Sequence, residues 1–233
     1  SASYNSGTGN AALVFRYTVV EDNTGTSDLL VSSSSGTITD AAGGAAASAS
    51  GDLGTVVVDA DTPDMTGCDA TDGDYGVGEA ISITCTFDEA VTVTGTPTIT
   101  LSNGDTASYA SGSGNAGIVF STTVAQGDTA SSDLSVSSIS ATANGATMKD
   151  AAGNAISATV TGGDLGAVTV DGAVPVFSSV AATDGAYGVG ESLSITVTWG
   201  EAVVVSGTPT LTLSNGDTAS YVSGTGSTAL VFT

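Results

Sequence analysis

The chain has 233 residues, of which 24 are Asp or Glu and two are Lys or Arg, and it contains no histidine. The formal charge of −22 at pH 7 argues against binding to nucleic acid and against insertion into or binding to an anionic membrane. Because 40% of the residues are apolar and only 11% are charged, the chain can bury a core, and we do not expect disorder. No run of 18 apolar residues occurs, so no membrane-spanning helix is predicted.

An internal repeat with a period near 110 residues organises the chain. Thr-Asp-Gly-Asp-Tyr-Gly-Val-Gly-Glu at 71–79 returns with one substitution at 183–191, which is 112 positions later. Leu-Ser-Asn-Gly-Asp-Thr-Ala-Ser-Tyr at 101–109 returns at 213–221 with the same offset. A period of this length matches one β-sandwich domain and is too long for a solenoid coil or a propeller blade.

An earlier copy of the repeat opens the chain, since the sequence at 6–15 matches that at 111–120. The repeat therefore predicts three parts: the later part of one repeat at 1–62, a complete repeat at 63–174, and the first half of another at 175–233. We call these the first segment, the middle repeat and the last segment. Both ends of the sequence are expected to fall inside a domain.

Alternating apolar and polar residues predict strands in all three parts. Every second residue from Ile81 to Phe87 is apolar, which indicates a half-buried strand, and the same pattern occurs at 193–199 and 13–19. No stretch predicts a helix, so the expected fold class is all-β, with tandem immunoglobulin-like β-sandwich domains. Further β-rich runs bounded by turn residues lie at 97–102, 105–110, 116–124, 132–139 and 166–171.

Cys68 and Cys85 are the two cysteines of the chain, and both fall in the middle repeat. The matching positions in the last segment are Val180 and Val197, so both cysteines replace valines of the core type. A joint replacement of this kind, in a chain expected to be secreted, favours a disulfide that adds roughly 3 kcal/mol by restricting the unfolded chain. Two buried free thiols are the alternative.

Acidic residues recur at equivalent turn positions of the repeats and form the candidate metal ligands. Mutual repulsion of the carboxylates favours screening or binding by cations. Turns at the ends of neighbouring domains are expected to meet at a junction, where hard oxygen ligands suit Ca²⁺. A solvated acidic surface is the alternative, because Asp is also a common turn residue. The predicted calcium ligands are Asp59, Asp61, Glu89, Asp72, Asp74, Glu79, Asp171 and Glu201.

Catalytic patterns are absent from the sequence. Without histidine, neither a Ser-His-Asp nor a Cys-His arrangement can form, and zinc loses its commonest nitrogen ligand. Paired carboxylates could indicate a glycosidase, but here the acids recur in turns rather than in one cleft. We therefore expect no enzymatic activity.

Four motifs carry a resemblance to a known group of proteins. They are the Asp-Gly-x-Tyr-Gly-x-Gly-Glu turn, Val-Thr-Val-Thr-Gly-Thr-Pro-Thr-Ile-Thr-Leu at 91–101, Ser-Gly-Ser-Gly at 111–114 and Asp-Ala-Ala-Gly-Asn at 150–154. The chain resembles the tandem immunoglobulin-like or cadherin-like repeats of giant extracellular adhesins, best known from bacteria. The resemblance implies stalk or extender modules that often bind calcium. One departure is Asp-Ala-Ala-Gly-Gly at 40–44, where the Asn of the last motif is lost.

Three functions are weighed for a chain of this kind. The leading one is a spacer or stalk of a large surface adhesin outside the cell, stiffened by calcium, whose partners are neighbouring repeats or copies of the same protein. The second is a protomer of an extracellular filament, in which neighbours complete the partial domains at each end. The third is a carbohydrate-binding module that contacts glycans through an exposed row of aromatics. Tyr75 and Tyr187 are the candidates for stacking on glycan, although packing over a domain junction is the preferred interpretation of these two tyrosines. An ice-binding face along the threonines of 92–100 ranks last.

Overall fold

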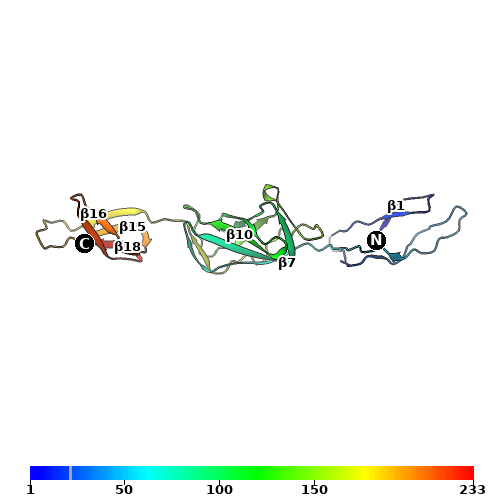
Figure 1. Cartoon of the computed structure of the whole chain (residues 1–233), viewed down its shortest axis with the longest axis horizontal. Coiled ribbons are helices and arrows are strands. Elements are labelled where there is room, and N and C mark those ends of the chain that lie inside the picture. The colour runs from blue at the N-terminus through cyan, green and yellow to red at the C-terminus, as the bar shows by residue number, and fades with distance from the viewer. Residues whose placement is uncertain (21–22) are drawn as a thin grey trace. The chain divides into compact units, whose positions relative to one another are not determined.

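The computed structural model describes residues 1–20 and 23–233, and its regular secondary structure is almost wholly β (Figure 1). This confirms the predicted all-β class. The one helical element described is a short 3-10 turn, η1 (Ala143–Gly145), and no described helix is long and apolar enough for a membrane span. The strands form several separate sheets within two compact units, one of residues 1–74, 80–122 and 131–169, the other of 75–79, 123–130 and 170–233.

A seven-stranded antiparallel sheet dominates the middle repeat. Six strands follow the order β11-β8-β9-β10-β7-β12, and the seventh strand, β5, pairs with β7. A separate two-stranded sheet joins β6 (Gly73–Gly76) and β13 (Val168–Asp171). The strands of the large sheet are β5 (Met65–Ala70), β7 (Ala80–Thr94), β8 (Thr98–Leu101), β9 (Thr106–Ser111), β10 (Asn115–Thr123), β11 (Val136–Ser140) and β12 (Thr147–Lys149).

The core of the middle repeat follows the predicted alternation. Along β7, every second residue from Ile81 to Phe87 is buried, and the residues between them are exposed. Side chains from distant parts of the chain complete this core, including Phe120, Leu134 and Leu165, each with no exposed surface. Burying a side chain of this size contributes about 1.5–3 kcal/mol.

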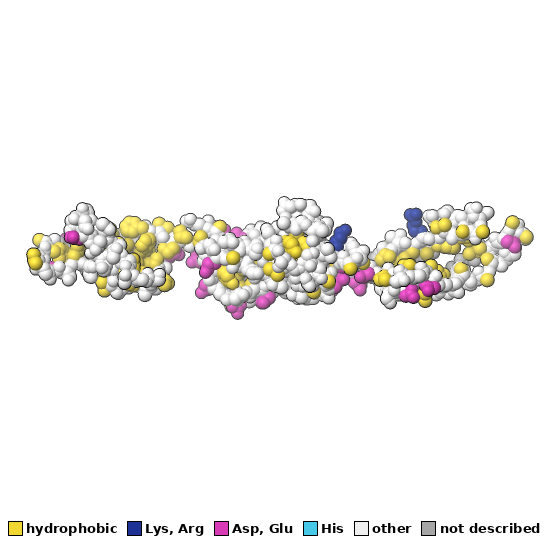
Figure 2. All heavy atoms as spheres, viewed as in Figure 1, with side chains coloured by type: hydrophobic (Ala, Val, Ile, Leu, Met, Phe, Trp, Pro, Cys, Tyr) yellow, Lys and Arg dark blue, Asp and Glu magenta, His cyan; other side chains and the backbone are white. Residues whose placement is uncertain are grey.

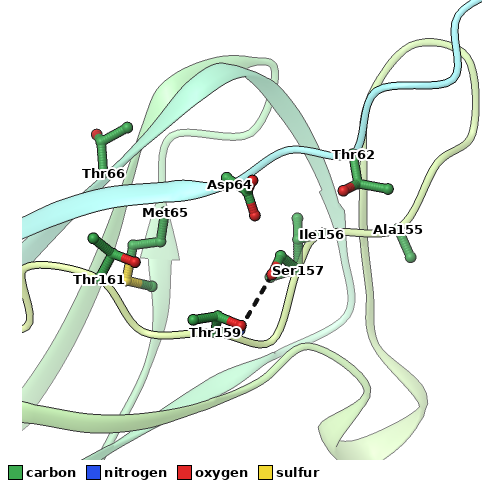
Figure 3. Close-up of a pocket in the computed structure, with 9 residues that line it drawn as sticks. All are labelled: Thr62, Asp64, Met65, Thr66, Ala155, Ile156, Ser157, Thr159 and Thr161. Atoms are coloured by element: carbon green, nitrogen blue, oxygen red, sulfur yellow. Dashed lines mark hydrogen bonds between the residues drawn. The ribbon is translucent and has the colours of Figure 1, made fainter. Parts of the chain in front are cut away.

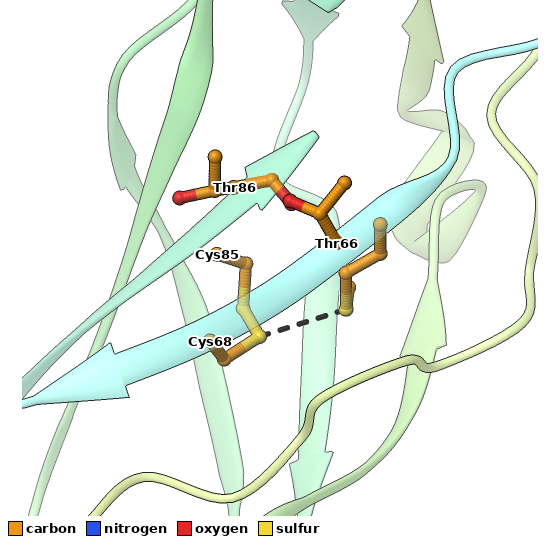
Figure 4. Close-up of a disulfide and its surroundings, with 5 residues drawn as sticks. Thr66, Cys68, Cys85 and Thr86 are labelled. Atoms are coloured by element: carbon orange, nitrogen blue, oxygen red, sulfur yellow. Dashed lines mark hydrogen bonds between the residues drawn. A yellow bond between two sulfur atoms is a disulfide. The ribbon is translucent and has the colours of Figure 1, made fainter. Parts of the chain in front are cut away.

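The predicted disulfide is present between two directly opposed residues of β5 and β7, Cys68 and Cys85 (Figure 4). Both residues are buried, Cys85 completely. The Cys68 Sγ lies 3.5 Å from the Sδ of Met65, an apolar contact because a disulfide sulfur has no proton to donate. The bridge therefore joins two adjacent strands inside the core.

One hairpin is built in the same way in all three parts of the chain. In the middle repeat it joins β9 and β10, and the hydroxyl of Tyr109 accepts the N–H of Ser113 at 3.1 Å. Gly112 has φ +105°, and a Cβ there would lie 2.3 Å from the carbonyl oxygen of Gly117, so the turn requires glycine. The equivalent tyrosine bonds are Tyr4 with Thr8 at 2.8 Å and Tyr221 with Thr225 at 2.9 Å.

The last segment forms a five-stranded antiparallel sheet in the order β14-β15-β18-β17-β16. Its core is a small cluster of Ile195, Val197, Ala219, Leu230 and Phe232. Trp199 packs against this cluster, with its ring 6.3 Å from that of Phe177 in an edge-on arrangement. The strands are β14 (Phe177–Ala182), β15 (Ile195–Val203), β16 (Thr210–Thr212), β17 (Thr218–Ser223) and β18 (Ser227–Phe232).

The first segment has less regular structure. It contains two strand pairs, β1 (Ser3–Ser6) with β2 (Val14–Arg16) and β3 (Leu30–Val31) with β4 (Gly51–Asp52). The alternation at 13–19 predicts a half-buried strand, but only Val14–Arg16 is a strand, and its residues are exposed. The reason is that β2 pairs with β1 alone, whereas its counterpart β10 in the middle repeat lies between β9 and β7.

Candidate metal centre

Three carboxylates meet where the first segment joins the middle repeat. Asp59, Glu89 and Asp150 each offer an oxygen, and these oxygens all lie within 4.8 Å of one another. Asp59 comes from the connecting segment, Glu89 from β7, and Asp150 directly follows β12. Two of these residues, Asp59 and Glu89, belong to the predicted ligand set.

Asp150 is held in place by its own loop. Its side chain is only 5% exposed, and Oδ1 accepts the N–H groups of Gly153 at 2.6 Å and Asn154 at 2.8 Å. The Asn154 side-chain amide donates to Oδ2 at 2.7 Å. A buried carboxylate that accepts several N–H bonds is oriented before any ligand arrives.

Asn154 also connects the loop to the segment that enters the repeat. Its Nδ2 donates to the backbone carbonyl of Asp59 at 3.2 Å. In the first segment, the equivalent loop has Gly44 in this position, and Asp40 Oδ1 accepts only backbone N–H groups, those of Ala42 and Gly44. The asparagine is therefore the residue that ties the connecting segment to the loop.

Negative charge accumulates around Glu89. Its pKa is raised above the ordinary value, first by burial and then by the carboxylates of Asp150, Asp59, Asp88 and Asp61. A cation in this position would offset both the burial and the repulsion. The donors are all hard oxygens, which suit Ca²⁺ rather than zinc, although backbone carbonyls or water must complete the six to eight ligands that Ca²⁺ takes.

Asp61, another predicted ligand, lies beside this group. Its backbone N–H donates to Asp59 Oδ1 at 3.3 Å, and its carboxylate is one of those that raise the pKa of Glu89. The structure thus brings three of the predicted residues to one place. Asp150 belongs to the cluster but is not among the predicted ligands. The feature of the sequence that points to it is the Asp-Ala-Ala-Gly motif, which occurs at both 40–43 and 150–153.

Of the other predicted ligands, four accept hydrogen bonds and the fifth lies on a strand. Glu201 lies on β15, and the grouping of these residues around a second calcium ion stays a prediction. The bonds are those of Asp72 with the Ala167 N–H at 2.8 Å, Asp74 with the Thr169 hydroxyl, Glu79 with the Gly76 N–H at 2.8 Å and Asp171 with the Ala173 N–H at 2.9 Å.

A groove of about 880 Å³ runs along the start of β5 (Figure 3). It lies between β5 and the segment 155–161, and Asp64 is the one ionisable side chain in its lining. Two carboxyl groups are needed for glycoside hydrolysis, so this lining does not offer that chemistry. The lining residues are Thr62, Asp64, Met65, Thr66, Ala155, Ile156, Ser157, Thr159 and Thr161.

A scan against protein-family models and searches of curated proteins and of solved structures found no match to this chain.

Proposed function

We propose that the chain is a structural part of an extracellular protein, in which tandem immunoglobulin-like β-sandwich repeats act as a spacer or stalk of a large surface adhesin. Calcium held by Asp59, Glu89 and Asp150 stiffens the entry into the middle repeat. The observation that carries the proposal is the approach of these three carboxylates from two parts of the chain. Similarity of the motifs to adhesin repeats supports it.

The position of the cluster explains how a cation would affect mechanics. Asp59 belongs to the connecting segment, whereas Glu89 and Asp150 belong to the body of the repeat. A shared cation would hold the connection against the repeat, and its removal would leave carboxylates that repel one another. Calcium sites of extracellular modules often have dissociation constants of about 10⁻⁴–10⁻³ M, which suits a fluid rich in calcium.

The disulfide and the amino-acid composition support an extracellular, non-catalytic role. Disulfides such as Cys68–Cys85 persist mainly in oxidising compartments. The chain has no histidine, and the carboxylates of Asp72, Asp74 and Glu79 each accept a hydrogen bond from another part of the repeat or from their own turn. These features favour a mechanical role over catalysis.

Thermal unfolding of the whole chain with calcium and with EDTA tests the proposal. Calcium at about ten times its Kd should add about 1.4 kcal/mol to the free energy of unfolding, and so raise the Tm. Glu89→Gln and Asp59→Asn should lose this response. Asp133→Asn, at an exposed position of another loop, is the matched control and should keep it.

Magnesium at equal ionic strength separates binding from charge screening, because Mg²⁺ demands a stricter octahedral geometry. Equal Tm values in calcium and EDTA would contradict the proposal. If the Glu89→Gln variant keeps the full rise of Tm with calcium, the ion binds somewhere other than this cluster.

A further inference from the structure

The Cys68–Cys85 bridge lies close to the point where the chain enters the middle repeat. Cys68 is the fourth residue of β5, the first strand of the large sheet. Cys85 is in β7, which pairs with β10 and β12 as well as with β5. A pull on the connecting segment therefore reaches β5 first, and the bridge joins β5 to a strand that is held by several neighbours.

The few residues of the repeat that precede the bridge are held by individual hydrogen bonds. The Asp64 N–H donates to Asp88 Oδ1 at 2.9 Å, and the Asp88 N–H donates to the Asp64 carbonyl at 3.0 Å. The Thr66 hydroxyl donates to the Thr86 carbonyl at 3.0 Å. Such bonds open locally and one after another, so a load reaches the covalent bridge after few of them have broken.

The bridge also closes a covalent loop to which the end of the repeat is bonded. Residues 69–84 lie between the cysteines and include β6, which pairs with β13, the last strand of the repeat. The Gly73 N–H donates to the Ala167 carbonyl at 3.0 Å, and Asp72 accepts the Ala167 N–H at 2.8 Å. Because one end of the loop continues into β7 and the other is bridged to it, the loop stays attached to the sheet when the start of β5 is pulled away.

Without a load, the bridge is closed to molecules in solution. Cys85 has no exposed surface, and Cys68 is 9% exposed. Thiol–disulfide exchange requires a thiolate to reach one of the two sulfur atoms. Figure 2 shows acidic side chains on the visible surface of the middle repeat, and the charge of −22 repels an anionic thiolate. The folded repeat therefore resists reduction until part of β5 is displaced.

We propose that the Cys68–Cys85 bridge limits the extension of the middle repeat under tension and becomes a site of thiol exchange when β5 is pulled away. The load then passes through the S–S bond, and residues 69–84 stay unextended. The thiolate of a small thiol attacks Cys68 Sγ on the displaced strand and forms a new S–S bond with it. The original bond breaks, and Cys85 leaves as a thiolate that takes a proton from water. The inference rests on the mechanical role proposed above and names its regulation by thiols.

Exchange releases a fixed length of chain. The two cysteines are 17 residues apart in the sequence. An extended chain spans about 3.3–3.6 Å per residue, so opening of the bridge adds about 6 nm. The loop thus provides additional length to a chain whose middle repeat has already unfolded under load.

Single-molecule force spectroscopy of the whole chain, held through its two ends at constant force, tests the proposal. With reduced glutathione present, we expect unfolding of the middle repeat to be followed by a further step of about 6 nm. The rate of this step should rise with the thiol concentration. A double variant, Cys68→Val with Cys85→Val, is the control: it copies Val180 and Val197, should show no thiol-dependent step, and should unfold in one step that is longer by the same length.

Alkylation and mass spectrometry of the unloaded chain in the same glutathione test whether exchange depends on load. We expect both cysteines to remain bridged for the time in which the loaded chain is reduced. Labelling without load at the rate seen under load, or no 6 nm step in the wild type, which needs no variant, would overturn the proposal. A Tm that does not respond to calcium, with the thiol-dependent step intact, would instead overturn the calcium role alone.

Discussion

The same phenylalanine of one hairpin occurs in three environments. Phe120 in the middle repeat has no exposed surface, Phe232 in the last segment is 4% exposed, and Phe15 in the first segment is 45% exposed. The hairpin itself is the same each time, because its glycine and tyrosine contacts are local. Local sequence therefore specifies the turn, while burial depends on strands from elsewhere in the chain.

Truncation of these three residues should give the largest and most graded effect. Phe120→Ala should cost about 3–5 kcal/mol of unfolding free energy, because it leaves a cavity in a packed core. Phe15→Ala, which removes a half-exposed ring, should cost much less, with Phe232→Ala between the two. Hydrogen exchange of each hairpin measures the three costs separately. Equal costs for Phe15 and Phe120 would show that the first segment is covered in solution.

The second contrast is the disulfide, which one copy has and the next copy lacks. Replacing Cys68 and Cys85 by the valines found at 180 and 197 should cost about 3 kcal/mol in the chain-entropy model for residues 17 apart. Conversely, cysteines at Val180 and Val197, which are directly opposed, should stabilise the last segment. Urea unfolding with and without reductant measures both changes. A middle repeat equally stable after reduction would contradict this account.

The loop that holds Asp150 offers a smaller contrast with the first segment. Asn154→Gly copies the residue found at Gly44 and removes the amide bonds to the Asp150 carboxylate and the Asp59 carbonyl. Leaving buried acceptors without these bonds should cost about 1–3 kcal/mol. Asn154→Asp, similar in size, should cost more in EDTA than in calcium because it adds a carboxylate to the cluster. Thermal unfolding measures both changes in stability. An Asn154→Gly variant with the Tm of the wild type would show that the asparagine does not stabilise the junction.

The sequence could predict features that depend on short spacing. Alternation along Ile81–Phe87 predicts a half-buried strand, and the paired replacement of two valines predicts the disulfide. Asp150 was missed because its importance comes from burial and from its approach to Asp59, and the two are far apart in sequence. The exposure of Phe15 was missed for the same reason: alternation specifies which side of a strand is apolar but not whether another strand covers it.

The smallest expected effect is the pH dependence of Glu89. Burial and the surrounding carboxylates raise its pKa above the ordinary value of 4.5, so the folded protein binds more protons between the two pKa values than the unfolded one. In EDTA, the stability contributed by this group should therefore fall as pH rises through that window. Glu89→Gln should then be more stable than the wild type at neutral pH, and the difference should vanish below the ordinary pKa.

Calcium should reverse that order at neutral pH, because the ion needs the Glu89 carboxylate that the glutamine variant lacks. Urea unfolding of both proteins across the pH range, in EDTA and in calcium, measures this reversal. Parallel pH curves would show that Glu89 does not sense its acidic neighbours. Curves that diverge as the pH rises in EDTA but keep the same order in calcium would mean that the repulsion at this junction is real but that calcium does not offset it.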